Sequence, residues 1–109
     1  MKQIPFYKLR PAYGSKELLI EFNLKSNIDE LIQKLTELLE ANGFKFDGIR
    51  DVWMNDEFWF HFSSENGGVI LSKDIYDIVF ITGENNQKDI LRIDEILKKH
   101  DAYLRQDLS

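Results

Sequence analysis

The spacing of hydrophobic residues along the chain changes between the two-residue period of strands and the longer period of helices. Leu18, Ile20, Phe22 and Leu24 recur at every second position, which predicts a half-buried strand. The preceding segment RPAYGS contains Pro and Gly and favours a turn. Residues 4–9 are therefore predicted to be an earlier strand or an arm folded back on this one.

The clearest helical pattern predicts a helix over residues 28–42. Its hydrophobic positions share one face: Ile28, Leu31, Ile32, Leu35, Leu38 and Leu39. Asn27 with Glu30 fits a capping box, and the pair one residue earlier is the alternative. Asn42-Gly43 favours the left-handed conformation that ends a helix.

From residue 44 to residue 82 the period returns to two and predicts strands joined by tight turns. A break in the alternation at Gly48 indicates a β-bulge. Asn66-Gly67 is a strong signal for a hairpin with a type I′ turn. With these residues at its centre, Phe62 pairs with Leu71 and His61 pairs with Ser72.

Two strands in this region are rich in apolar residues. Phe58, Phe60 and Phe62 share one face of a strand and are expected to pack into the core. Residues 78–81 are apolar at every position, which predicts a strand buried on both faces.

The last periodic segment predicts a helix over residues 87–104. Its hydrophobic face contains Ile90, Ile93, Leu97 and Leu104. Asn86 can cap its first turn.

The order of these elements predicts an α+β fold. Strands joined by tight turns pair antiparallel, and each amphipathic helix must bury its apolar face. We expect a two-layer domain, in which two helices (about 28–42 and 87–104) pack on one face of an antiparallel sheet of about 4–6 strands. The length of 109 residues fits a single globular domain over 1–109, with 1–13 as an arm or an edge strand.

The charge distribution indicates a protein partner rather than a nucleic acid. Residues 1–25 hold five basic and two acidic side chains, whereas residues 26–109 hold nine basic and seventeen acidic ones. An acidic body repels phosphate backbones and attracts a basic protein. Ordinary solubility charge is the alternative interpretation.

The amino-acid composition also indicates where in the cell the protein is expected. The chain has no cysteine, which excludes disulfides, zinc-thiolate sites and thiol nucleophiles. Its longest apolar run, Ile78–Ile81, is far shorter than the roughly 20 residues of a membrane-spanning helix. No signal-peptide pattern is present at the start. We expect a cytoplasmic protein with no membrane association.

No motif for catalysis, metal binding or a cofactor is found. Asp51, Asn55, Asp56 and Glu57 lack the spacing of a calcium loop, and so does the group Glu84, Asn85, Asn86 and Asp89. A turn explains the first group and a helix N-cap explains the second. His100 fits a solvated helix end. We therefore expect no catalytic residue, metal or cofactor.

The residues that alternate with the three phenylalanines form the candidate binding surface. Trp59 and His61 point away from the predicted core, and Trp53 can join them. Exposed tryptophan is enriched where interfaces bind most strongly. The acidic rim of this partner-binding surface consists of Asp51, Asp56 and Glu57, with Asp47 nearby. Alternatively, the N-terminal arm covers Trp59 with Phe6, Tyr7 and Leu9.

These features lead to a main functional hypothesis and two alternatives. The main one is a non-enzymatic protein-binding module, in particular an acidic inhibitor that binds a basic partner. Small size, acidity, absence of cysteine and an α+β fold are similar in character to bacterial toxin-immunity proteins; the likeness rests on these traits and on no sequence motif. The alternatives are a small ligand-binding protein or enzyme with a pocket around His61, and a homodimer joined through the aromatic sheet face.

Overall fold

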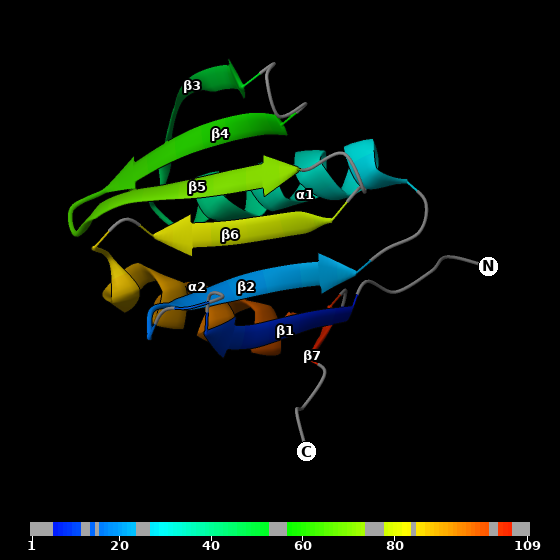
Figure 1. The fold of residues 1–109 in the computed structure, drawn as a ribbon, viewed down its shortest axis with the longest axis vertical. Coiled ribbons are helices and arrows are strands. Elements are labelled where there is room, and N and C mark those ends of the chain that lie inside the picture. Colours follow the sequence, from blue (N-terminus) through cyan, green and yellow to red (C-terminus); the bar gives the residue numbers. More distant parts are fainter. Residues whose placement is uncertain are drawn as a thin grey trace.

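One mixed sheet of seven strands and two helices packed against it make up the fold (Figure 1). The computed structural model describes residues 6–11, 14, 16–23, 27–52, 57–73, 78–83, 85–100 and 103–105, without the side chains of residues 50–52 and 57. The strands are β1 (Phe6–Pro11), β2 (Leu18–Asn23), β3 (Lys45–Val52), β4 (Glu57–Ser64), β5 (Gly67–Lys73), β6 (Val79–Gly83) and β7 (Leu104–Arg105). The helices are α1 (Ile28–Ala41) and α2 (Gln87–Lys98).

The strand order is β3-β4-β5-β6-β2-β1-β7. Neighbours pair antiparallel except β1 and β7, which are parallel. The α+β class with both helices on one face is confirmed, but the expected antiparallel sheet of 4–6 strands is wrong. The sheet gains a short strand after α2, and a strand of two residues is too short to show a two-residue period.

Both helices cover the same face of the sheet, called here the helix side. Figure 1 shows α1 behind the middle strands and α2 behind β2 and β1, while the opposite face, the open face, looks toward the viewer. The buried hydrophobic residues of both helices form one cluster with the helix-side residues of the sheet, including Phe22, Phe62, Leu71 and Ile81.

Helix α1 agrees with the sequence pattern except at its first turn. It spans Ile28–Ala41, and Gly43 has a φ of +90°, as expected of a left-handed stop. Asn27 instead adopts a left-handed φ of 60°, and its side chain makes no capping hydrogen bond. The expected capping box is therefore not formed with Asn27 as the cap.

The β4–β5 hairpin has a register two residues away from the expected one. Ser64 pairs with Gly67, Phe62 with Val69 and His61 with Ile70. Positive φ falls on Gly67 (φ +129°) and not on Asn66, so no type I′ turn centred on Asn66-Gly67 forms. Because a shift of two keeps every side chain on its original face, the hydrophobic pattern could not distinguish the two registers.

Helix α2 ends at Lys98, earlier than the expected residue 104. The chain then turns, and Tyr103 becomes 6% exposed, packing at 6.1 Å between ring centroids against Phe22. Leu104 is 45% exposed and pairs with Phe6 of β1. The spacing of Leu104 from Leu97 fitted a helix by coincidence, because Leu104 lies in β7, where the chain is extended.

Candidate functional site

The predicted partner-binding residues are only partly within the described residues. Trp59 and His61 lie on the open face, both half-buried, with ring centroids 6.3 Å apart. Asp51 and Glu57 lie in β3 and β4, but their side chains are outside the description.

Trp53 and Asp56 lie outside the described residues altogether. The structure therefore brings together only Trp59 and His61 of the predicted set.

His61 lies in β4, next to the edge strand β3, and has a paired residue on each side. It pairs with Gly48 of β3, at the predicted β-bulge, and with Ile70 of β5. Its Nε2 atom is enclosed and has no hydrogen-bond partner among the described residues. A buried nitrogen without a partner costs free energy.

The N-terminal strand does not cover Trp59. β1 pairs with β2 and β7 at the far end of the sheet from β4, and Tyr7 packs on the helix side against Phe22. The alternative in which Phe6, Tyr7 and Leu9 pack onto Trp59 is therefore wrong. Of the strand or arm predicted over residues 4–9, the described part lies in the strand β1, and residues 4 and 5 lie outside the described residues. Because β1 lies between β2 and β7, it is not an edge strand.

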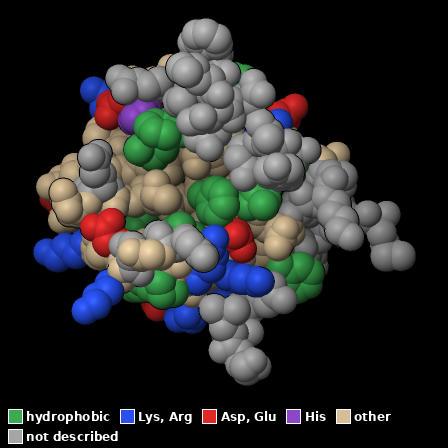
Figure 2. Space-filling model, viewed as in Figure 1, with side chains coloured by type: hydrophobic (Ala, Val, Ile, Leu, Met, Phe, Trp, Pro, Cys, Tyr) green, Lys and Arg blue, Asp and Glu red, His purple; other side chains and the backbone are tan. Residues whose placement is uncertain are grey.

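The open face carries both signs of charge. Arg10 forms an ion pair with Glu21 at 2.9 Å, and its guanidinium group lies 5.9 Å from the centre of the Phe80 ring. Figure 2 looks onto this face, and most of the Lys and Arg side chains in view gather toward the end where β1 and β2 lie. The described part of this face is thus a mixed surface.

The three phenylalanines of β4 differ in burial along the strand. Phe62 is 1% exposed and belongs to the core, Phe60 is half-buried, and Phe58 is 44% exposed. The expectation that all three fill the core is therefore wrong. The helices lie behind the middle strands and behind β2 and β1, and the end of the sheet formed by β3 extends beyond α1 (Figure 1).

Exposed hydrophobic side chains of β3 and β4 form what we call the hydrophobic strip, on the helix side. It consists of Phe46 (38% exposed), Ile49 (59%), Phe58 (44%) and the half-buried Phe60. The β3–β4 register places Phe46 opposite Phe62 and Ile49 opposite Phe60, so these side chains share the face of the core.

Between the hydrophobic strip and α1 lies a groove with a volume of 490 Å³. Its lining consists of Asp29, Ile32, Gln33, Thr36 and Glu37 from α1, with Phe46 and Phe60 from the sheet. It lies on the helix side, so it does not form the pocket expected around His61. The sequence pattern could not reveal it, because the pattern places residues on faces and does not show how far a helix extends over a sheet.

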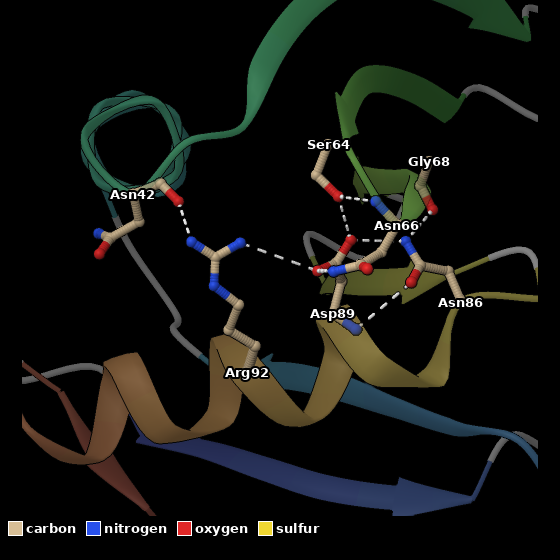
Figure 3. Close-up of polar contacts among 7 residues, drawn as sticks. All are labelled: Asn42, Ser64, Asn66, Gly68, Asn86, Asp89 and Arg92. Carbon is tan, nitrogen blue, oxygen red and sulfur yellow. Dashed lines mark hydrogen bonds and ion pairs between the residues drawn. The ribbon is translucent and has the colours of Figure 1, made fainter.

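A second cluster of polar residues surrounds the side chain of Asp89, which is fully buried (Figure 3). Its Oδ2 accepts hydrogen bonds from Ser64 Oγ at 2.5 Å and from Asn86 Nδ2 at 2.8 Å. Its Oδ1 accepts one from Asn66 Nδ2 at 3.0 Å. Asn86 also caps α2, as expected, by accepting from the Asp89 backbone N–H.

These contacts set the charge state of Asp89. Burial raises the pKa of this carboxyl, but the hydrogen bonds from Ser64, Asn86 and Asn66 and the nearby Arg92 guanidinium outweigh burial and leave the pKa below its ordinary value. Asp89 is therefore ionised at neutral pH. The hydrogen bonds of this cluster connect the hairpin turn to the first turn of α2.

Arg92 extends the cluster to α1. Its Nη1 lies 3.9 Å from Asp89 Oδ1, its Nη2 donates to the backbone oxygen of Asn42, and its guanidinium group lies 5.0 Å from the Phe44 ring centre. Figure 3 shows this side chain reaching from α2 toward the end of α1. A guanidinium group can serve all three neighbours because it is planar and carries several donors.

Close packing around Asn86 depends on a glycine in β6. A Cβ atom at Gly83 would lie 2.6 Å from the Asn86 backbone oxygen, a distance that requires the backbone to move. The Asn86 side chain also donates to the Gly68 carbonyl of the hairpin. Of the group Glu84, Asn85, Asn86 and Asp89, Asn86 caps α2 and Asp89 accepts the buried hydrogen bonds, whereas Glu84 lies outside the described residues. The sequence pattern did not indicate the buried contacts, because Ser64 and Asn66 are distant in sequence.

Comparisons with known proteins identify no relative. No protein-family model, no curated protein and no solved structure matches this chain. Among the described residues, no helix has the length and apolar character needed to cross a membrane.

Proposed function

We propose that the chain is a non-enzymatic protein-binding module that docks its partner on the hydrophobic strip. The observation that carries the proposal is the exposure of Phe46, Ile49 and Phe58 on the same face of two paired strands. Large apolar side chains that gather on a surface mark interaction sites, whereas single exposed ones are ordinary.

The charge of the molecule supports a basic partner. The net charge is −5, and two of the groove-lining residues, Asp29 and Glu37, are acidic. Complementary charge accelerates the encounter of two proteins and orients them, while apolar contacts hold the complex. An acidic inhibitor of the immunity type, acting in the cytoplasm on a basic protein, is the specific form of this proposal.

The proposed docking surface differs from the one expected from the sequence alone. Trp59 and His61 lie on the open face, opposite the hydrophobic strip. Their role in partner binding stays a separate prediction.

The test compares two matched variants in a pull-down from the native cell lysate at low salt. Ile49→Asp places a carboxylate in the hydrophobic strip, and Leu91→Asp makes the same change at a residue of α2 that is 48% exposed and outside it. We expect wild type and Leu91→Asp to recover the same partner and Ile49→Asp to lose it. The partner, identified by mass spectrometry, is then purified and its affinity for each variant is measured by calorimetry.

Circular dichroism and thermal unfolding confirm that each variant is folded. Equal affinity of Ile49→Asp and wild type would overturn the proposal. A homodimer in light scattering that Ile49→Asp dissociates would also overturn it, because the hydrophobic strip would then be a self-association surface.

A further inference from the structure

The hydrophobic strip is wide enough to carry one helix. The hydrophobic strip covers two strands, β3 and β4, and strands lie about 4.8 Å apart, so it is about 10 Å wide. Packed helices lie about 8–10 Å apart. A helix laid on the strip beside α1 would therefore continue the layer that α1 and α2 begin.

The flank of α1 that faces this space is acidic. Asp29, Gln33 and Glu37 line the groove at intervals of four residues, so they form a row along the helix axis. At a rise of about 1.5 Å per residue, Asp29 and Glu37 lie about 12 Å apart. Among the described residues, none that lines the groove is basic.

The free edge of β3 is less suited to an added strand. The β3–β4 register shifts between Phe46 and Gly48, and Gly48 has a φ of +139°. A bulge at a sheet edge bends the strand and interrupts its row of backbone donors and acceptors, which is how edge strands avoid pairing. A helix needs no backbone hydrogen bonds from β3.

We propose that the occupant of the hydrophobic strip is a basic amphipathic helix of a partner protein. Its apolar face lies on Phe46, Ile49 and Phe58, and Lys or Arg side chains about two turns apart face Asp29 and Glu37 of α1. This assignment rests on the proposed function and adds the secondary structure and the charge pattern of the segment that binds.

The test is a selection from a displayed library of random 18-residue peptides, performed on the folded full-length protein. Peptides that bind wild type are counter-selected on Ile49→Asp, so that only binders of the hydrophobic strip remain. We expect these peptides to show apolar residues at intervals of three and four, with Lys or Arg seven or eight residues apart. Helix formation on binding is measured by circular dichroism of synthetic peptides.

Charge reversal tests the acidic row. Asp29→Lys with Glu37→Lys is expected to weaken the selected peptides about tenfold at low salt. The matched control is Glu65→Lys with Glu95→Lys, which changes the net charge equally at exposed residues outside the groove lining. We expect the control to change affinity several-fold less.

The outcomes separate this inference from the proposed function. Peptides that lose binding to Ile49→Asp but whose apolar residues alternate with a period of two would overturn the helix and leave the docking surface in place. Peptides whose binding both charge reversals weaken equally would overturn the charge pattern and leave the docking surface in place. Binders that all tolerate Ile49→Asp would overturn the proposed function as well.

Discussion

Asp89 shows how this fold stabilises a buried charge. Removing a carboxylate from water is costly unless donors replace the water. Ser64, Asn66 and Asn86 donate to its oxygens, and the first turn of α2 places it where a helix favours negative charge. The donors come from the hairpin and from α2, so the carboxylate joins two elements that are distant in sequence.

Replacing this carboxylate by an amide is expected to destabilise the protein. Asp89→Asn leaves at least one buried donor without an acceptor, and we expect a loss of about 2–4 kcal/mol in the free energy of unfolding. Urea unfolding at neutral pH measures it. Glu65→Gln, an exposed change of the same kind in the hairpin turn, is expected to stay within about 0.5 kcal/mol.

The pH dependence of this difference follows from the pKa of Asp89. Because the folded-state pKa lies below the ordinary value, the carboxylate stabilises the folded protein fully above about pH 4, and this stabilisation is lost as the pH falls toward the folded pKa. The difference between wild type and Asp89→Asn should therefore stay constant from about pH 7 to about pH 5 and shrink as the pH falls below about 4. A difference that stays constant below about pH 4 as well would show that Asp89 is not ionised in the folded protein.

At the scale of elements, the C-terminal segment joins α2 to the edge of the sheet. Tyr103 packs on Phe22, and Arg105 of β7 lies 3.7 Å from the buried Asp94 of α2. The Tyr7 hydroxyl of β1 donates to the Asp94 backbone oxygen at 3.5 Å. These contacts explain why the chain leaves the helix after Lys98.

Two adjacent substitutions distinguish this arrangement from a longer helix. Tyr103→Ala is expected to cost about 3–5 kcal/mol because it empties a core position, whereas Leu104→Ala should cost less than about 1 kcal/mol. Chemical denaturation of both variants measures the costs. A helix that continued to residue 104 would reverse their order, since Leu104 would then lie in the apolar face.

At the scale of the whole molecule, the coverage of the sheet is uneven. β5, β6 and β2 have partners on both sides and carry fully buried residues such as Leu71, Ile81 and Ile20, whereas β3 is an edge strand next to the hydrophobic strip. Local stability follows such differences in burial and pairing.

Hydrogen exchange should reveal this gradient. We expect the amides of β6 to exchange more slowly than those of β3 by about tenfold or more, after correction for intrinsic rates. Exchange detected by NMR measures each strand separately. Equal protection of the two strands would indicate that the hydrophobic strip is covered in the free protein.

The sequence alone determined the features that depend on near neighbours. The period of hydrophobic residues predicted α1 over nearly its full length, the start of α2, the bulge at Gly48 and the α+β class, because these follow from local geometry. Asn86 was recognised as a cap for the same reason.

Only the tertiary structure decided the features that depend on distant contacts. The hairpin register was undetermined because a shift of two keeps each side chain on its face. Phe58 and Phe62 are both phenylalanines on the same face of β4, yet Phe62 is buried in the core cluster with residues of both helices, whereas Phe58 lies outside that cluster and is exposed. The hydrophobic strip and the Asp89 cluster are each formed by residues of elements that lie together only in the folded protein. The spacing of hydrophobic residues in the sequence does not show which elements will lie together.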